Sequence, residues 1–200
     1  MQFLDTPVTL TLTDPKLMYL IAHPLRMRII GSLRIDGPAT SAILARRLQT
    51  DSGQTSYHLR HLAKYGLVEE AADLGRGPRS RERWWRAVHQ STRWSVPNDA
   101  QLDAGGRDAM LAVERAARTV WDQAIDTFNT DVAKQRWSAD WQRVAYSSDH
   151  VIRMAPSRVE WFRSQVTRLM DECETADAPD SAQAEKVLII LHTYPHRAQR

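Results

Sequence analysis

Apolar residues recur every three or four positions near the start of the chain, which is the spacing of helices with one buried face. Two helices are predicted, over residues 16–22 and 25–35, the first with Asp14 as its N-cap. His23-Pro24 separates them, because the residue before a proline avoids helical backbone angles. The predicted buried stripe of the second helix is Leu25, Ile29, Ile30 and Leu33.

A second pair of helices follows, joined by a tight turn. The pattern predicts helices over residues 41–48 and 53–65, with Thr40 or Ser41 capping the first and Gly66 ending the second. Two strand-like runs come next, over 67–72 and 81–88. A loop of Arg, Gly and Pro joins them. The order of helix, turn, helix and hairpin is typical of a winged helix, which places one helix in a DNA major groove.

An alternating run at residues 8–13 predicts one further strand, and residues 89–106 are weakly patterned. We place a domain boundary in the weakly patterned stretch, which gives a DNA-binding domain over 1–95 and a second region over 96–200. A helix over 107–134 opens that region with a wide apolar stripe that needs a partner, either a second chain or the chain's own C-terminal elements. The residues predicted for dimerisation are Met110, Val113, Ala117, Val120, Ala124 and Phe128.

The end of the chain predicts a strand, a helix and a second strand within residues 150–192. The strands are expected at 150–154 and 187–191, the second fully apolar and buried, and the helix between about 156 and 173. The predicted fold class is therefore mainly α (α+β). It comprises a winged helix-turn-helix DNA-binding domain, a long dimerisation helix and a small α/β C-terminal unit.

The predicted helix over 53–65 carries side chains that suit a DNA groove. Arg can donate two hydrogen bonds to guanine, and Gln can pair with adenine. Residues near the N-terminus of such a helix usually reach the bases, and free amides there favour a phosphate. A solvated amphipathic helix would also turn polar residues outward. The candidate DNA-contacting residues are Gln54, Thr55, Tyr57, His58, Arg60, His61 and Lys64, with Gln54, Thr55, Tyr57 and His58 expected nearest the bases.

Positive charge coincides with this motif. Up to Ser95 the chain has 14 Lys and Arg against 8 Asp and Glu, a net +6, whereas the rest has 13 against 16, a net −3. A polyanion-binding surface needs such a bias. The predicted wing over 74–83 fits phosphates or a minor groove, although a solvated loop tip is the alternative. The candidate wing residues are Arg76, Arg79, Arg81 and Arg83.

Other function classes find little support. The chain has no glycine-rich phosphate loop, no Gly-x-Ser-x-Gly and no His-Glu-x-x-His, so no catalytic residue, enzyme activity or cofactor is predicted. The single cysteine, Cys173, excludes an intrachain disulfide, fits a reducing cytoplasm and is predicted to be apolar filler. No signal pattern or membrane-spanning run is predicted. Three tryptophans could line a small-molecule pocket, although aromatic residues at such spacings are more often core: Trp137, Trp141 and Trp161.

Several short motifs together resemble those of the ArsR-type winged-helix repressors of bacteria. They are His23-Pro24-Leu25-Arg26-Met27-Arg28-Ile29-Ile30, Ala39-Thr40, Leu44-Ala45, Ser56-Tyr57-His58-Leu59-Arg60-His61-Leu62, Gly66-Leu67-Val68 and Arg81-Glu82-Arg83-Trp84-Trp85. The resemblance covers about residues 14–88. It implies a cytoplasmic, homodimeric transcription factor whose affinity for double-stranded DNA responds to a signal, with 53–65 as the recognition helix.

The chain departs from the metal sensors that it resembles. Those proteins carry paired cysteines before the turn or Asp/His pairs on a terminal helix, and neither is present here, so no metal site is predicted. The C-terminal half also exceeds the compact form, as a dimerisation brace or a pocket for a small-molecule effector. We predict a dimeric, sequence-specific transcriptional repressor. The alternatives are a low-specificity architectural DNA-binding protein and a winged-helix module that binds a protein or a ligand.

Overall fold

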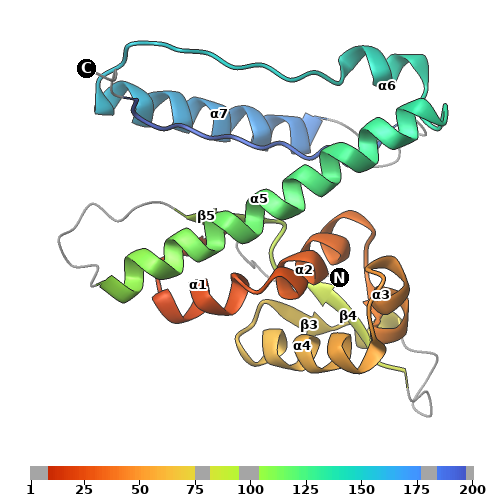
Figure 1. The fold of residues 1–200 in the computed structure, drawn as a ribbon. Coiled ribbons are helices and arrows are strands. Elements are labelled where there is room, and N and C mark those ends of the chain that lie inside the picture. Colours follow the sequence, from red (N-terminus) through yellow and green to blue (C-terminus); the bar gives the residue numbers. More distant parts are fainter. Residues whose placement is uncertain (1–8, 75–81, 95–103, 177–183, 197–200) are drawn as a thin grey trace. The chain divides into compact units, whose positions relative to one another are not determined.

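Two short helices pack against one long helix, and two more pack against the second of these short helices (Figure 1). The computed structural model describes residues 9–74, 82–94, 104–176 and 184–196. The helices are α1 (Pro15–Ile21), α2 (Pro24–Ile35), α3 (Ser41–Arg47), α4 (Ser52–Lys64) and the long α5 (Ala104–Ala133). Helices α1 and α2 pack against α5, while α3 and α4 form the helix-turn-helix pair.

Polar side chains set where the short helices begin. Asp14, His23, Thr40 and Asp51 occupy the N-caps, and each side chain accepts a hydrogen bond from a backbone N–H of the following turn. Gly66 follows α4 with φ of +67°, in the left-handed region that closes helices. The predicted limits of these four helices are confirmed to within one residue.

A three-stranded antiparallel sheet completes the winged helix. Its order is β2 (Ala39–Thr40), β4 (Trp84–Ala87) and β3 (Val68–Glu70), with Ala39 and Glu70 both opposite Trp85. After β3 comes a short 3-10 turn, η1 (Ala72–Leu74). Across the hairpin, Arg86 contacts Glu69 at 2.8 Å and Asp73 at 3.1 Å. The predicted hairpin is therefore confirmed at its base.

Two strands far apart in the sequence form a separate parallel sheet. Strand β1 (Thr9–Leu12) is at the predicted place, and it pairs with β5 (Ser91–Trp94), which the weak pattern of residues 89–106 did not predict. Arg34, near the end of α2, holds this region by donating from Nε to His89 O at 2.7 Å and from Nη2 to Thr92 Oγ1 at 2.8 Å. Burial lowers the pKa of Arg34 to about 10, so the guanidinium is still charged at neutral pH.

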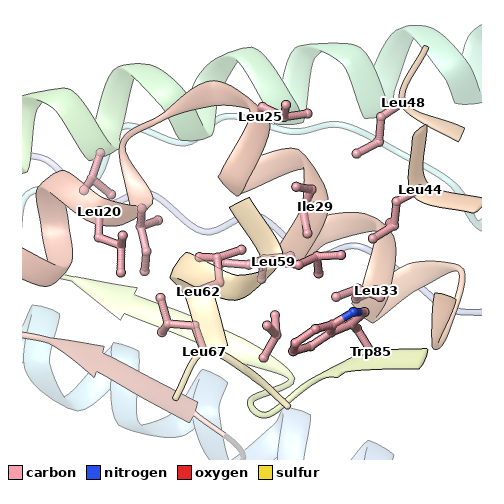
Figure 2. Packing of buried hydrophobic residues seen from close by; sticks show 14 of the residues in the cluster. Leu20, Leu25, Ile29, Leu33, Leu44, Leu48, Leu59, Leu62, Leu67 and Trp85 are labelled. Carbon is pink, nitrogen blue, oxygen red and sulfur yellow. The ribbon is translucent and has the colours of Figure 1, made fainter. Parts of the chain in front are cut away.

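The core lies between the helices and the sheet. Figure 2 shows side chains from α1 to α4 and from β4 converging on one another, and Ala109 and Val113 of α5 belong to the same cluster. The predicted stripe of α2 is confirmed, since all four of its residues are at most 8% exposed. The labelled members of the cluster are Leu20, Leu25, Ile29, Leu33, Leu44, Leu48, Leu59, Leu62, Leu67 and Trp85.

Part of the stripe predicted for dimerisation is used within the chain. Val113 and Ala117 of α5 are 0% and 1% exposed, so the protomer's own core accounts for their apolar character. They cannot face a second chain without leaving that core. The other four members of the stripe are half-buried, and their role in dimerisation stays a prediction: Met110, Val120, Ala124 and Phe128.

By its contacts the chain divides into residues 1–134 and 135–200. The first half of α5 thus belongs to the same compact unit as the winged helix, because α1 and α2 cover it. The predicted assignment of a DNA-binding domain to 1–95 and of a dimerisation region to 96–200 concerns function and stays a prediction.

The second unit contains α6 (Ala139–Val144) and α7 (Pro156–Ala176). The predicted helix is confirmed, but the strands expected at 150–154 and 187–191 are wrong for the single chain. Both segments pair with no strand in the described part of the chain, and most of their apolar side chains are exposed. Cys173, expected to be buried filler, is exposed on α7. The whole is a winged helix followed by long helices, as predicted for its mainly helical class.

We expect opposite effects from alanine at two glycines. Gly66→Ala places a Cβ in the left-handed region and should lower the free energy of unfolding by about 1–2 kcal/mol. Gly31→Ala, inside α2, should raise it by up to about 1 kcal/mol, because alanine favours helix. There the new Cβ would lie 3.9 Å from Val120 Cγ1, an ordinary contact. Urea denaturation of both variants checks the pair, and equal effects would contradict the backbone assignment.

Candidate nucleic-acid interface

The outer face of α4 is polar, cationic and open to solvent. Gln54, Tyr57, Arg60 and Lys64 are all exposed, Tyr57 to 56%. They follow one another at three or four residues, so they share one face of the helix. Arg60 Nε donates to Ser56 O at 3.3 Å. Four of the seven predicted residues are therefore placed where a ligand can reach them.

A cleft of about 410 Å³ lies beside this face. It joins the start of α3, the middle of α4 and the base of the wing, because β2 leads directly into α3 and pairs with β4. Arg60 from α4 and Arg83 from just before β4 both line it. The remaining lining residues are Thr40, Ser41, Ala42, Ser56, Glu82 and Trp85.

The chemistry of the cleft suits a phosphate-bearing ligand. Two guanidinium groups and the hydroxyls of Ser41 and Ser56 can donate hydrogen bonds to phosphate oxygens, the commonest protein contacts to DNA. Glu82 contributes one opposing carboxylate at the wing side. An arginine on the exposed face of a helix can also reach guanine in a major groove. The cleft thus has donors suited to phosphate oxygens next to an arginine suited to a base edge.

Thr55 does not lie on this surface, contrary to the prediction. Its side chain is 0% exposed, and the single proton of its hydroxyl is shared between Ser41 O at 2.9 Å and Ser52 O at 3.0 Å. These bonds connect the start of α3 to the first turn of α4. Thr55 therefore positions the two helices of the motif and cannot read a base.

His58 is also buried rather than directed at DNA. It is 7% exposed, its ring lies 4.5 Å from that of His23, and its Nδ1 accepts from Arg26 Nε at 3.2 Å. Burial, followed by the charges of His23, Arg26 and His61, lowers the pKa of His58 to about 4. Arg26 also donates from Nη1 to Leu20 O at 3.0 Å. His58 is thus a neutral acceptor that helps to join α4 to α2 and α1.

The amides at the start of α4 are already in use. Asp51 Oδ1 accepts from Gly53 N at 2.7 Å and from Gln54 N at 3.0 Å. The carboxylate fills the place where free amides were expected to attract a phosphate, so that expectation is wrong. A Cβ at position 53 would lie 2.8 Å from the same oxygen, which is the physical reason for a glycine there.

The remaining predicted residues have mixed placements. His61 is half-buried between Tyr57, stacked at 6.1 Å, and Tyr65, edge-on at 5.7 Å. Arg83 is exposed and lines the cleft. Arg76, Arg79 and Arg81 lie outside the described residues, so their roles stay predictions.

The three tryptophans predicted for a pocket lie in the second unit. Trp137 and Trp141 are half-buried, and their rings meet edge to face with centroids 6.3 Å apart. Trp161 is 48% exposed and carries the Arg158 guanidinium 3.7 Å from its ring centre. The cation stacked on Trp161 occupies one face of that ring. An effector pocket at these residues stays a prediction.

Two further searches cover only the described part of the chain. No three His, Cys, Asp or Glu side chains there gather as a metal ion would require. Nor does any helix among those residues combine the length and apolarity needed to cross a membrane.

Six of the eight cleft residues were not predicted as site residues, among them Ser41, Ala42 and Ser56. Ser56 and Arg60 are four residues apart, so a projection of the helix alone could have grouped them. Ser41 and Ala42 join them only because β2 pairs with β4 and orients α3. The sequence contains no local signal for that juxtaposition.

The sequence matches the family model described as "Helix-turn-helix domain" over residues 21–71, a span that includes α2, α3, α4 and β3. No curated protein matches the chain at a significant level. Solved structures that are similar include a mutant of Lactococcus lactis ZitR in apo form, 13% identical with a TM-score of 0.31 over 74% of this chain and 83% of that one. A MarR-family transcription regulator is 13% identical with a TM-score of 0.29, covering 82% of each chain. RV1404 from Mycobacterium tuberculosis is 16% identical with a TM-score of 0.25, over 80% of this chain and 73% of that one. The chain thus contains a helix-turn-helix domain.

Acid should weaken the fold through His58. Its pKa is about 4 in the folded protein against an ordinary 6.5, so below pH 6.5 the unfolded chain takes up a proton that the folded chain refuses. The stability that this provides is complete above pH 6.5 and is lost as the pH falls towards 4. It amounts to about 3 kcal/mol at most, at about 1.4 kcal/mol for each pKa unit.

Urea denaturation at pH 7.5 and at pH 5 measures this effect. His58→Gln keeps an acceptor for Arg26 but cannot titrate, so its free energy of unfolding should fall less between the two pH values than that of the natural protein. Gln54→Ala, an exposed change on the same helix, should retain the natural pH dependence. An unchanged pH dependence in His58→Gln would contradict the assignment.

Proposed function

We propose that the chain is a dimeric, sequence-specific DNA-binding transcriptional regulator of the ArsR type, non-enzymatic and acting as a repressor in the cytoplasm. One observation carries the proposal. The exposed polar face of α4 adjoins a cleft lined by both Arg60 of α4 and Arg83 of the wing. Helix α4 would enter the major groove of DNA, and the wing would follow the flanking DNA backbone. The helix-turn-helix match over residues 21–71 supports the same assignment.

Charge supports a polyanionic partner. The residues up to Ser95 carry a net +6, and the described cations of the site lie on its exposed side. Within the site, Gln54 and Arg60 are suited to base edges, while Lys64 and Arg83 are suited to phosphates. Tyr57, between them on the same face, offers a hydroxyl and an aromatic ring to either. The DNA sequence would therefore be read by few residues, and most of the affinity would come from contacts to the DNA phosphates.

Repression would follow from occupancy by two copies. A helix-turn-helix dimer presents its recognition helices about 34 Å apart, one turn of DNA, so both can bind successive major grooves. A small-molecule effector that changed this spacing would change affinity. The C-terminal unit, with Trp137, Trp141 and Trp161, is the part of the chain that we propose for such a signal.

Binding to DNA from the chain's own promoter, compared with random duplex, tests the proposal. Fluorescence anisotropy at fixed salt should show a preference of at least about 10³-fold. Equal affinity for both duplexes would favour the low-specificity architectural alternative. No binding to either duplex would favour the protein-interaction or ligand-binding alternative.

Arg60→Ala should reduce sequence discrimination. If its guanidinium pairs with a base, the preference for promoter over random duplex should fall by about 1–3 kcal/mol, or roughly 5- to 150-fold. Arg143→Ala removes the same charge from an exposed position on α6 and should leave the preference unchanged. An equal loss of affinity for both duplexes in Arg60→Ala would instead make Arg60 a phosphate contact.

Arg83→Ala should act on affinity rather than on discrimination. Promoter and random duplex should both bind more weakly, and the slope of log affinity against log salt should fall by about one unit, because one phosphate contact is lost. Titrations of each duplex with the protein at several salt concentrations, from roughly 50 to 200 mM, measure this slope. An unchanged slope would exclude Arg83 from phosphate binding.

A further inference from the structure

The C-terminal unit exposes apolar side chains in two extended segments, the mixed residues 146–154 and the wholly apolar residues 187–191 (Figure 1). Val151 is 97% exposed and Ile152 is 64% exposed in the first. In the second, Val187 and Ile189 are 63% and 61% exposed. Contiguous apolar surface of this kind is rare on single soluble proteins and marks a surface that another molecule covers.

Within the described part of the chain, the backbone of these segments also has no strand partner. Both are extended, yet neither forms a strand pair with any other stretch that the structure describes. Extended chain with apolar side chains is a template for β-pairing, since its N–H and C=O groups point sideways. What covers these segments should therefore supply strands as well as apolar surface.

The second segment needs cover on two sides. Its consecutive residues Val187, Leu188 and Ile189 are all at least 47% exposed, and consecutive residues of a strand point to opposite faces. Strands that are apolar on both faces occur in sheets buried on both sides. Helix α7 has a single half-buried stripe, formed by Val159, Phe162, Val166 and Met170, and one helix can cover only one of the two faces.

The order of segments in the C-terminal unit is that of a β-α-β unit without a sheet. One segment leads into α7 and the other follows it, and Figure 1 shows both running opposite to α7, hence in the same direction as each other. This is the order of a β-α-β unit, whose parallel strands normally lie in one sheet. Here the unit has the crossover helix and the strand-forming segments without the sheet.

Charge favours a second copy of the chain as the missing part. Residues 135–200 contain nine Lys and Arg and nine Asp and Glu, a net charge of zero. No charge opposes self-association, and no excess of either sign selects an acidic or a basic partner. A second copy supplies the same two strand-forming segments and the same apolar faces, so the exchange is mutual.

We propose that residues 146–154 and 187–191 of one chain pair as β-strands with the same segments of a second copy. Each C-terminal unit then covers the apolar residues of the other in an intermolecular sheet. The inference deepens the proposed function, which requires two copies, and it places the dimer contact in the C-terminal unit rather than on α5.

Sedimentation of the full-length chain without DNA tests the proposal. Val151→Lys and Ile189→Lys replace exposed side chains, and the 97% exposed Val151 contributes no packing within the protomer. Each variant should raise the dimer dissociation constant by about 100-fold or more. Ile125→Lys makes the same change at a 48% exposed position of α5 and should leave the dimer intact. Dissociation by Ile125→Lys with no effect of the other two would overturn the proposal in favour of a seam along α5.

Hydrogen exchange of the natural protein gives a second readout that needs no variant. In the dimer, backbone amides of residues 187–191 should exchange slowly, and dilution below the dissociation constant should make them exchange fast. A dimer with fast exchange there, or a chain that stays monomeric at every concentration, would overturn the pairing. A protected dimer that binds no duplex would uphold the pairing and remove only the proposed function.

Discussion

The attachment of the inner face of α4 determines what its outer face can do. Leu59 and Leu62 are completely buried in the core, while Thr55 and His58 form hydrogen bonds to α3 and α2. Apolar burial holds the helix close, and the directional bonds fix its rotation about its own axis. Because the rotation is fixed, Gln54, Tyr57, Arg60 and Lys64 point outward together. The candidate interface is thus a consequence of packing on the opposite side of one helix.

Much of the helical architecture could be predicted because its signals are local. Caps such as Asp14 and Thr40 and the stripe of α2 act within one or two turns, and the structure has them as expected. The errors in the site had a different cause. Thr55, His58 and Leu62 are spaced by three and four residues, so periodicity alone places them on the buried face. The general rule that residues at a helix N-terminus reach DNA does not hold for Thr55 and His58, whose positions follow this periodicity.

Other features had no local signal. Strand β5 is defined by its pairing with β1, some 80 positions earlier. It is also held by Arg34, whose side chain donates a hydrogen bond to Thr92 of β5. In the C-terminal unit the apolar run of Val187 to Leu191 predicts burial. A sequence pattern records a need for burial but not which molecule meets it. The expectation of a buried strand therefore failed for the single chain, where these residues are exposed.

Arg26 gives the helix-turn-helix motif a mechanical link to the rest of its unit. The guanidinium bonds at once to His58 of α4 and to the carbonyl of Leu20 in α1, and Tyr19 of α1 donates to Gly105 O of α5 at 3.1 Å. Sliding of α5 along α1 would therefore stretch a short series of bonds that ends at His58, on the buried face of α4. A displacement of α5 would be transmitted to α4 through these three side chains as well as through the apolar core that α5 shares.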